Sequence, residues 1–406
     1  MISVWFYLIA ASFGHPLAAL DDVVLIIKTG KEVVDTRLMP LLNTSSQFDY
    51  FRNRLIVSND VHAELQVFDA IANMSWLARA RQRVLANPEL FKEYLARTPP
   101  QKPAAKKNPK RAFGRALPGW HTDQHKNLPA FRRAFELFPQ AKWFFMIDDD
   151  TYVSARNLAR FVTARNSSAG VYAGNVMGCN CCEAGKSARY SPVRFAHGGS
   201  GILLSNTALA RMTDVIDACI FRFSGCWAGD IQVSLCLLGL EPQIKMQGLV
   251  GVHSQPPTAT LSKTHGRWCE NPITFHRMLP EQILHLSAVE EQSWSLRNRF
   301  QFDEIIEPFF IDSVIGDRVA VPLSTDVVCL EDTINYGGVL DSKQLSHSAN
   351  LTDCSRFCEQ RQECLGVVFI RTNGTCLLKR NIASVVQNFN ATFCMHTAHI
   401  KSRFIC

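Results

Sequence analysis

Three consecutive carboxylates, Asp148, Asp149 and Asp150, directly follow the apolar run WFFMI at residues 143–147. An apolar run of this length is typical of a strand buried on both faces of a parallel sheet. Such a strand delivers the residues that follow it to the carboxyl edge of the sheet, where α/β proteins bind ligands. Adjacent carboxylates repel one another, and a divalent cation such as Mg²⁺ or Mn²⁺ would compensate them. The motif therefore predicts a metal–diphosphate site.

Other interpretations of the three acids are available. A helix-loop-helix Ca²⁺ site needs alternating acids, a central glycine and a distal glutamate, which this segment lacks. An Asp-x-Asp-x-Thr phosphatase motif fails because Thr151 stands one position too early. The structural alternative is that the acids cap a helix beginning near Ser154, since Asp and Ser both favour helix N-termini.

A glycine cluster and a lone carboxylate further along the chain could complete such a site. Gly198, Gly199 and Gly201 precede an apolar strand, and glycine permits close backbone approach to a ligand. Asp230 stands at the start of an apolar helix, where it is either an N-cap or a general base. Two histidines follow in polar surroundings, and each is a ligand candidate once a metal is suspected: His253 and His276.

The elements that must position these residues alternate between strands and helices. Residues 23–27 and 55–57 are short β-branched runs closed by polar residues, which predicts two buried strands. The stretch 62–97 has apolar residues at helical spacing, and residues 128–138 predict a helix before the strand at Trp143. Alternating strands and helices predict an α/β layered domain with a mostly parallel sheet.

Composition describes a globular protein with one unusual basic stretch. The chain has 406 residues, enough for two or three domains, and 47% of them are hydrophobic. Seven Lys and Arg residues lie at 97–115 without an acid, which equals the whole net charge of +7. This Pro/Ala/Lys-rich stretch predicts a solvated loop, in preference to a patch for nucleic acid or anionic lipid.

Several features predict passage through the secretory pathway. Residues 1–20 contain an apolar run typical of a signal peptide or a short signal-anchor. The chain has 14 cysteines, which suits an oxidising compartment. It also carries six Asn-x-Ser/Thr acceptor sites for glycosylation, at Asn43, Asn73, Asn166, Asn350, Asn373 and Asn390. We expect the Golgi lumen, with membrane anchorage, or secretion.

The C-terminal part has the cysteine density of a small disulfide-stapled domain. Cys354 and Cys358 are one helical turn apart, so both thiols share a helix face. A zinc site is the competing interpretation, but no Cys-x-x-Cys pair supports it. The six cysteines concerned are Cys329, Cys354, Cys358, Cys364, Cys376 and Cys394.

The order of these segments resembles the fringe and core-1 β1,3-galactosyltransferase group, glycosyltransferases of family 31 with the GT-A fold. The resemblance covers roughly residues 21–300. It rests on residues 26–29, the acidic motif with its flanks at 142–153, residues 195–205, Asp230 in its helix, and residues 272–276. It implies a Rossmann-like mixed sheet flanked by helices, over residues 21–321.

The resemblance also implies roles for individual residues. Asp150 would be the direct metal ligand, Asp148 and Asp149 would contact ribose or metal-bound water, and Asp148 could share the metal. Asp230 would be the catalytic base. A histidine would complete the metal site, with His253 and His276 both open. Mn²⁺ would be the cofactor. The donor-binding residues would be Thr29, Asp60, Lys126, Asp148, Asp149, Gly198, Gly199 and Gly201.

Residues 322–406 resemble a PAN/apple domain by cysteine spacing, an α+β fold that binds proteins or carbohydrates. That family's nested pattern implies the pairs Cys354–Cys376, Cys358–Cys364 and Cys329–Cys394. Phe369, Leu377 and Leu378 would supply its small core.

Two hypotheses of different classes follow. The first is a Mn²⁺-dependent, inverting transferase that moves a hexose from a UDP-sugar to a glycan or glycoprotein hydroxyl. Under it the linkage is β1,3, the sugar is galactose or an N-acetylhexosamine, and no nucleic acid is bound. The second is a secreted carbohydrate- or protein-binding protein whose transferase fold is degenerate. The intact acids, glycines and Asp230 favour the enzyme.

Overall fold

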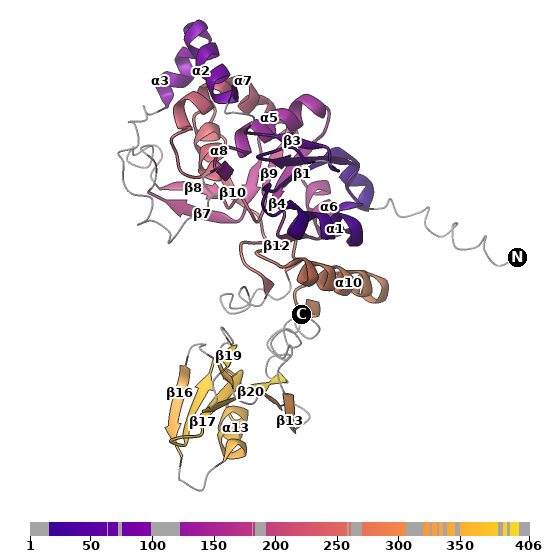
Figure 1. Ribbon diagram of the computed structural model, residues 1–406, viewed down its shortest axis with the longest axis vertical. Coiled ribbons are helices and arrows are strands. Elements are labelled where there is room, and N and C mark those ends of the chain that lie inside the picture. The colour runs from indigo at the N-terminus through magenta and orange to yellow at the C-terminus, as the bar shows by residue number, and fades with distance from the viewer. Residues whose placement is uncertain are drawn as a thin grey trace, which may run out of the picture. The chain divides into compact units, whose positions relative to one another are not determined.

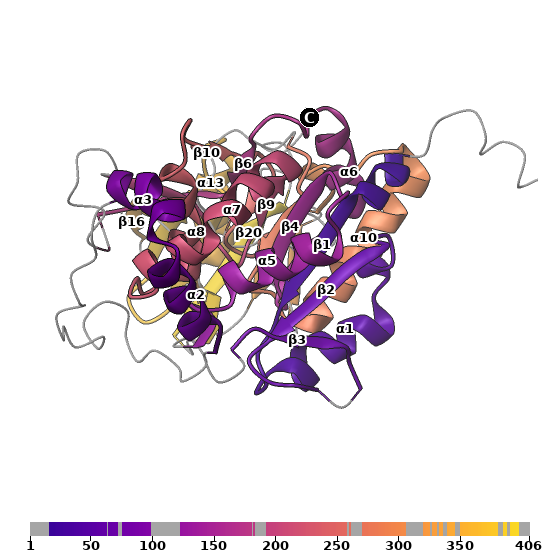
Figure 2. The same cartoon turned by 90° about the horizontal axis from the view of Figure 1, so that it is seen from above.

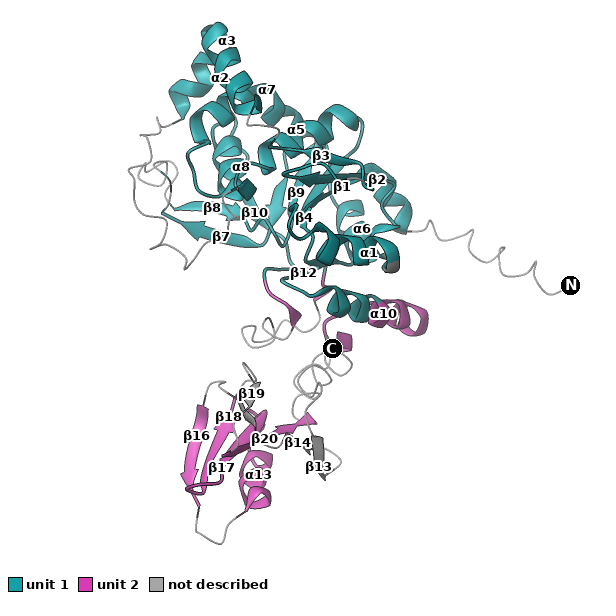
Figure 3. Ribbon diagram, in the orientation of Figure 1, with its two compact units in different colours: residues 1–254, 273–287 teal, residues 255–272, 288–406 magenta. Residues whose placement is uncertain are grey.

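The computed structural model describes most of the chain, in two compact units (Figure 3). Unit 1 comprises residues 1–254 and 273–287, and unit 2 comprises residues 255–272 and 288–406. Helix α10 (Pro280–Arg297) is divided between them. The described residues are 16–62, 64–71, 75–98, 122–180, 182, 192–257, 260, 270–305, 320–324, 327–330, 333–335, 339–345, 350–380, 385–387 and 390–397.

Unit 1 is built on a seven-stranded sheet (Figure 1). Its central strands are runs of Val, Ile, Leu and Phe, which favour a pleated surface buried on both faces. Four of the six neighbouring pairs are parallel, while β9 runs antiparallel to both β4 and β6. In spatial order the strands are β10 (Met246–Gly248), β6 (Tyr172–Gly174), β9 (Ile202–Ser205), β4 (Trp143–Asp148), β1 (Val23–Lys28), β2 (Asn53–Ser58) and β3 (Val67–Asp69).

Helices cover both faces of this sheet, which confirms the predicted α/β layered class (Figures 1 and 2). On one face a continuous apolar core joins the sheet to helices α2 (Ser75–Ala86), α3 (Pro88–Arg97), α5 (Asn127–Leu137), α7 (Asn206–Phe223) and α8 (Gly229–Leu238). The other face carries α1 (Met39–Thr44) and α6 (Ala155–Thr163). The architecture agrees with the GT-A fold. Short helices are η1 (Pro16–Asp22), η2 (Val34–Leu38) and η3 (Ser46–Phe48).

The prediction for residues 62–97 was incomplete. Helices α2 and α3 do occupy most of this stretch, but β3 precedes them as an edge strand. It has three residues, too few to display a period of two that sequence could reveal. The predicted helix at 128–138 is confirmed as α5.

Two smaller sheets in unit 1 lie beside the acidic motif and the glycine cluster. The first orders β11 (Val252–His253), β12 (Thr274–His276) and β5 (Thr151–Val153), with β12 antiparallel to β5. The second pairs β7 (Val176–Cys179) with β8 (Val193–Ala196). Because β5 follows the acids directly, its pairing with β12 brings the acidic motif to a segment more than 120 residues later.

Unit 2 contains a six-stranded antiparallel sheet and helix α13 (Leu351–Glu359). Asn350 caps this helix in a capping box with Asp353. The sheet order is β13 (Ala320–Ser324), β14 (Val327–Leu330), β20 (Ala391–His396), β17 (Gly366–Ile370), β18 (Thr375–Lys379) and β16 (Val339–Gln344). A two-stranded sheet, β15 (Thr333–Asn335) and β19 (Val385–Gln387), and helix α11 (Asp303–Ile305) complete the described elements.

Three disulfides staple unit 2, and they are the same pairs that the apple-like spacing implies. They join Cys329 to Cys394, Cys354 to Cys376 and Cys358 to Cys364. Their sulfurs form the buried core together with Leu378, while Phe369 packs against it. Between the described residues of unit 1 there are two more, Cys182–Cys226 and Cys219–Cys236.

Some sequence predictions fall outside the described residues. These are the apolar start up to His15, the basic stretch beyond Thr98, Asn73, and the cysteines Cys181, Cys269 and Cys406. Among the helices that the structure describes, none has the length and apolarity needed to cross a bilayer.

Candidate active site

The acidic motif occupies the carboxyl end of β4, as predicted. Asp148 is the last residue of the strand, and Asp149 and Asp150 form the turn into β5. The backbone holds this turn from two sides, because Asp149 N–H donates to Lys28 O at 2.9 Å and Asp148 N–H donates to Gly199 O at 3.2 Å. Asp149 is buried, while Asp148 and Asp150 are half-buried.

The helix-cap alternative for these acids is wrong. Helix α6 begins at Ala155, and its N-cap is Ser154, whose hydroxyl accepts from Asn157 N–H. The capping position is therefore filled by the serine, and the carboxylates are directed to other partners. Asp230 is not an N-cap either, since Ala228 holds that position in α8 and Asp230 lies inside the first turn.

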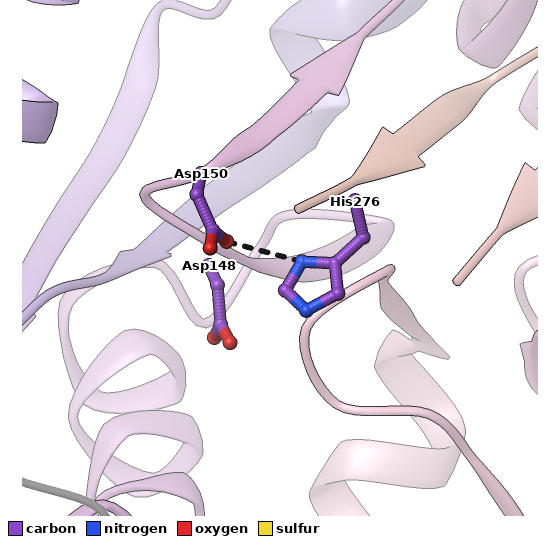
Figure 4. A group of neighbouring side chains, drawn as sticks. All are labelled: Asp148, Asp150 and His276. Carbon is purple, nitrogen blue, oxygen red and sulfur yellow. Dashed lines mark ion pairs between the residues drawn. The ribbon is translucent and has the colours of Figure 1, made fainter. Parts of the chain in front are cut away.

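Asp148, Asp150 and His276 form a group that could hold a metal ion (Figure 4). Each offers one ligand atom, and the three atoms lie within 4.8 Å of one another. The two carboxylates come from the β4–β5 turn, and the imidazole comes from the end of β12. Strand pairing sets this convergence directly, because His276 is opposite Thr151 in the β5–β12 ladder. Two carboxylates and an imidazole suit a divalent ion such as Mn²⁺.

The hydrogen bonds around His276 define which ring nitrogen is available. Thr151 Oγ1 donates its single proton to Gly199 O at 2.8 Å, so it can only accept from the ring. His276 Nδ1 lies 3.0 Å from that hydroxyl and 3.1 Å from Asp150 Oδ1. Nδ1 therefore carries the proton, and Nε2 retains the lone pair that a metal requires. Hydrogen bonding of the second nitrogen is the usual way in which proteins orient a ligating histidine.

Gly199 leaves the space into which these ligand atoms project. A Cβ at this position would lie 2.3 Å from His276 Cε1, 2.4 Å from Nε2 and 2.8 Å from Asp148 Oδ2. No side chain fits at such distances. The absence of a Cβ is thus what allows the imidazole and the carboxylate to face each other, and the donor set and its cradle both fit a metal ion.

Gly199→Ala is expected to weaken Mn²⁺ binding on the order of 100-fold, the loss typical when the support of a metal ligand is displaced. The drop in the electron paramagnetic resonance signal of free Mn²⁺ on binding measures this. Gly178→Ala is the matched control, because a Cβ there would approach Val193 O no closer than 3.9 Å. Equal Mn²⁺ affinity in the two variants would show that the space left by Gly199 is not needed for metal binding.

Basic side chains that the sequence analysis did not select surround the acids. Lys28 Nζ lies 3.1 Å from Asp148 Oδ1 and 2.5 Å from Asp123 Oδ2. Arg37 Nη1 lies 3.2 Å from Asp150 Oδ2 and 3.5 Å from Asp149 Oδ1, and this arginine is half-exposed. A signal for Lys28 existed, because it ends β1 and is in register with Asp148. The sequence holds no comparable signal for Arg37.

These neighbours and burial shift the pKa values of the site. Burial raises the pKa of Asp149 to about 7, and repulsion by Asp150 and Asp148 adds to it. Burial acts to raise the pKa of Asp150 as well, but the hydrogen bond and charge of His276 and the charge of Arg37 lower it overall. Burial acts to lower the pKa of Lys28, but the charges of Asp123 and Asp148 raise it overall. The lowered pKa of Asp150 keeps this carboxylate ionised near neutral pH, in the form that can bind a cation.

Asp230 lies against the other side of the glycine cluster. Gly198 N–H donates to its Oδ2 at 2.9 Å, and Ile231 N–H donates to its Oδ1 at 2.8 Å. A Cβ on Gly198 would lie 3.2 Å from Asp230 Cβ and 3.3 Å from Oδ2. Burial raises the pKa of this carboxyl to about 6, although the two N–H groups and Lys28 oppose the shift. A carboxylate with this pKa is suited to accept a proton near neutral pH.

His197, next to the glycine cluster, is a further residue that the sequence analysis did not select. Its Nδ1 accepts from Ser200 N–H at 3.2 Å, which leaves the proton of the neutral ring on Nε2. Its ring meets the His276 ring edge-on, with centroids 5.2 Å apart. Burial, followed by the charge of His276, lowers the pKa of His197 to about 4. Its position directly before Gly198 is the feature of the sequence from which His197 could have been selected as a site residue.

The remaining predicted residues lie at strand ends, except Lys126, which stands at the N-terminus of α5. Thr29 is buried and its hydroxyl donates to Asp149 Oδ2 at 2.6 Å, while Lys126 Nζ donates to Thr29 O at 2.7 Å. Asp60 is instead paired with Lys31 at the surface. His253 stacks on Phe275 with ring centroids 4.9 Å apart, and it is not among the converging metal-ligand candidates.

Comparisons with known proteins concern the part of the chain that carries the acids and Asp230. Residues 119–235 match a family model described as Fringe-like. Chondroitin sulfate synthase 3 of Homo sapiens and of Mus musculus are each 32% identical over 96 residues, 24% of this chain and 11% of the relative. Chondroitin sulfate glucuronyltransferase of Homo sapiens is 38% identical over 77 residues, 19% of this chain and 9% of the relative. The chain spans about a tenth of the length of these curated relatives. These likenesses, with the site described above, support a glycosyltransferase.

Proposed function

We propose that this chain is a metal-dependent, inverting glycosyltransferase that moves a hexose from a UDP-sugar to a hydroxyl of a glycan or glycoprotein. The family resemblance favours a β1,3-linkage. It also favours galactose or an N-acetylhexosamine as the transferred sugar. The names of the chondroitin-related proteins agree with a glycan acceptor.

One observation carries the proposal: consecutive glycines separate a metal-ligand group from a lone carboxylate. Gly199 faces His276 and Asp148, and Gly198 faces Asp230. The cluster therefore has a cationic, diphosphate-binding side and a proton-accepting side, with backbone alone between them. Transfer from a sugar diphosphate needs both functions within the span of one sugar.

The mechanism assigns one role to each side. Asp148, Asp150 and His276 would hold the ion, which when bound acts as a Lewis acid that neutralises charge developing on the leaving diphosphate. On the other side, an acceptor oxygen forms its bond to the anomeric carbon as the bond to the diphosphate breaks. Asp230 accepts the hydroxyl proton, and UDP leaves with the bonding electron pair. A single displacement inverts the anomeric centre, so an α-linked donor gives a β-linked product.

Residues on the β1 side would orient the nucleotide. Lys126 Nζ donates to the carbonyl of Thr29, and the Thr29 hydroxyl donates to Asp149. These hydrogen bonds hold the three side chains in place next to the acidic motif. Asp60 stands at the end of the adjacent strand β2 and can exchange its exposed partner Lys31 for a ribose or base at little cost. Arg37, half-exposed beside Asp150, is placed to meet an entering phosphate.

For unit 2 we propose a binding role of the PAN/apple type, with a carbohydrate or protein ligand. Its three disulfide pairs and its helix-and-sheet composition support this likeness. The disulfides, together with exposed asparagines at Asn43, Asn166, Asn350, Asn373 and Asn390, support maturation in the secretory pathway, in the Golgi lumen or beyond.

A donor screen tests the proposed function. The full chain is incubated with individual UDP-sugars and Mn²⁺, and UDP release is measured with and without a chelator. We expect Mn²⁺-dependent release from at least one donor, and chelation is expected to abolish it. If no donor is hydrolysed and Mn²⁺ does not promote UDP binding, the chain is instead a binding protein with a degenerate transferase fold.

A further inference from the structure

A cleft separate from the acidic motif and Asp230 lies in unit 1 among the helices that cover one face of the main sheet. It has a volume of about 340 Å³, within the lower range of ligand pockets. Its lining residues come from helices α2 and α5, with Phe68 from β3 and Ile220 from α7. None of its lining residues belongs to the site around Asp150 and Asp230.

Helical spacing explains why charged and aromatic groups gather in this cleft. Helix α2 contributes Trp76 and Arg79, three positions apart and therefore on one face. Helix α5 contributes Pro129, Arg132 and Arg133, at positions i, i+3 and i+4. Two amphipathic helices thus present guanidinium groups next to flat apolar surfaces.

The lining of the cleft has an excess of positive charge, and one of its arginines is anchored from behind by a carboxylate outside the lining. Asp217 of α7 is 95% buried and is bound by both Arg132 and Arg83, the latter at 3.0 Å. One carboxylate therefore holds two guanidinium groups. Each guanidinium has five N–H donors in a rigid fork, so the donors that do not face Asp217 can bind a second anion.

The two remaining arginines have weak partners. Arg79 Nη1 donates to the neutral Ser75 Oγ at 2.9 Å. Arg133 lies 3.3 Å from Glu136, but this is an exposed pair one helical turn apart, of a kind that contributes little. Among the lining residues, three arginines are set against one carboxylate, Glu136.

Trp76 supplies an aromatic surface for a ligand. The residue is only 6% exposed and it lines the cleft. Its Nε1–H has no hydrogen-bond partner among the described residues, but this nitrogen is enclosed and is not reached from the cleft. The ring therefore contributes a flat apolar face, on which a sugar ring can pack.

We propose that this cleft is an accessory site for an acidic saccharide, a sugar ring that carries a carboxylate or a sulfate. The arginines bind the anionic group, bidentate where geometry allows. The apolar faces of Trp76, Phe68 and Pro129 accommodate the ring. The site goes beyond the proposed transfer reaction, because none of its residues takes part in that chemistry.

Direct binding tests the accessory site. Calorimetry of the full chain is performed with a hyaluronan tetrasaccharide (carboxylate only), a chondroitin 4-sulfate tetrasaccharide (carboxylate and sulfate) and neutral chitotetraose. We expect at least one acidic tetrasaccharide to bind, and the difference between the two assigns carboxylate or sulfate as the preferred group. Arg79→Gln and Arg133→Gln should each weaken that binding about tenfold, the loss expected for a hydrogen bond to a charged group.

Matched controls separate a built site from general attraction. Arg81→Gln removes the same charge from an exposed position of the same helix, outside the cleft, and should leave affinity unchanged. Asp230→Asn should bind the tetrasaccharide normally, so this outcome does not depend on transfer activity.

Several results would overturn the proposal. They are absence of binding by both acidic tetrasaccharides, equal binding of chitotetraose, or equal weakening by Arg81→Gln and Arg79→Gln. Competition by inorganic sulfate as strong as that of the tetrasaccharides would identify a bare anion site and would equally reject the saccharide.

Discussion

Asp150→Asn is expected to lower sugar transfer by roughly 10³-fold or more, because metal stabilisation of a leaving group is worth several kcal/mol. The substitution removes the negative charge of the carboxylate whose Oδ1 faces His276 and whose Oδ2 faces Arg37. The same variant should bind Mn²⁺ more weakly, so both the donor complex and the chemical step suffer. Initial transfer rates across a Mn²⁺ titration measure both effects.

The variant should remain folded, which separates a lost ligand from a lost structure. Burial raises the pKa of Asp149 to about 7, with repulsion by Asp150 and Asp148 adding to it, so removing one charge relieves part of that repulsion. Because His276 and Arg37 lose their charged partner, we expect the metal-free variant to melt slightly lower than the natural protein while still unfolding in one cooperative transition. Asp214→Asn, at an exposed position of α7, is the control for loss of one surface charge. Unchanged Mn²⁺ dependence in Asp150→Asn would show that the metal is bound elsewhere.

Asp230→Asn is expected to reduce the rate of transfer by about 10²- to 10⁴-fold, the range of a general base, while Mn²⁺ and UDP affinity stay unchanged. Asparagine keeps the shape of the side chain and an oxygen for Gly198 N–H, but it cannot accept the acceptor proton. Calorimetry with UDP and Mn²⁺ provides the binding control. If the variant transferred sugar at the natural rate, another group would have to be the base.

The same residue sets the expected pH dependence. Because burial raises the pKa of Asp230 to about 6, the carboxylate form is lost as the pH falls through that value. The transfer rate should therefore be level above about pH 7 and fall about tenfold per pH unit well below pH 6. The residual transfer rate of Asp230→Asn should not decrease with pH in this way. If the transfer rate of the natural enzyme did not decrease between about pH 7 and pH 5, the assignment of Asp230 as the general base would be wrong.

The sequence allowed the main strands and the acids at their carboxyl edge to be predicted, because both depend on local pattern. A run such as Trp143-Phe-Phe-Met-Ile has few alternatives to a buried strand, and the acids must follow it. The order of the strands and the partners of the acids could not be predicted in this way. Lys28 and Arg37 reach the motif from more than 110 residues away, and no local period encodes that contact.

The choice of histidine illustrates the same limit. His253 and His276 have similar sequence contexts, and both lie in the small sheet of β11 and β12. The two histidines differ in what lies next to them. His276 is in β12, which pairs with β5, so it lies opposite Thr151, whereas His253 in β11 stacks on Phe275. Antiparallel pairing of two three-residue strands depends on tertiary context, because such strands are too short to be specified by propensity.

The β5–β12 ladder also has a consequence for how the protein can be divided. The chain leaves unit 1 at Ser254 and returns at Ile273, and the return strand delivers His276 to the acids. The stretch 119–235 that matches the Fringe-like model contains Asp148, Asp150 and Asp230 but ends before this strand. A recombinant fragment with those limits would keep the recognisable motifs and lack the imidazole. A fragment that is to carry the whole proposed metal site therefore has to extend through β12. Its affinity for Mn²⁺ would then report whether β12 has paired with β5.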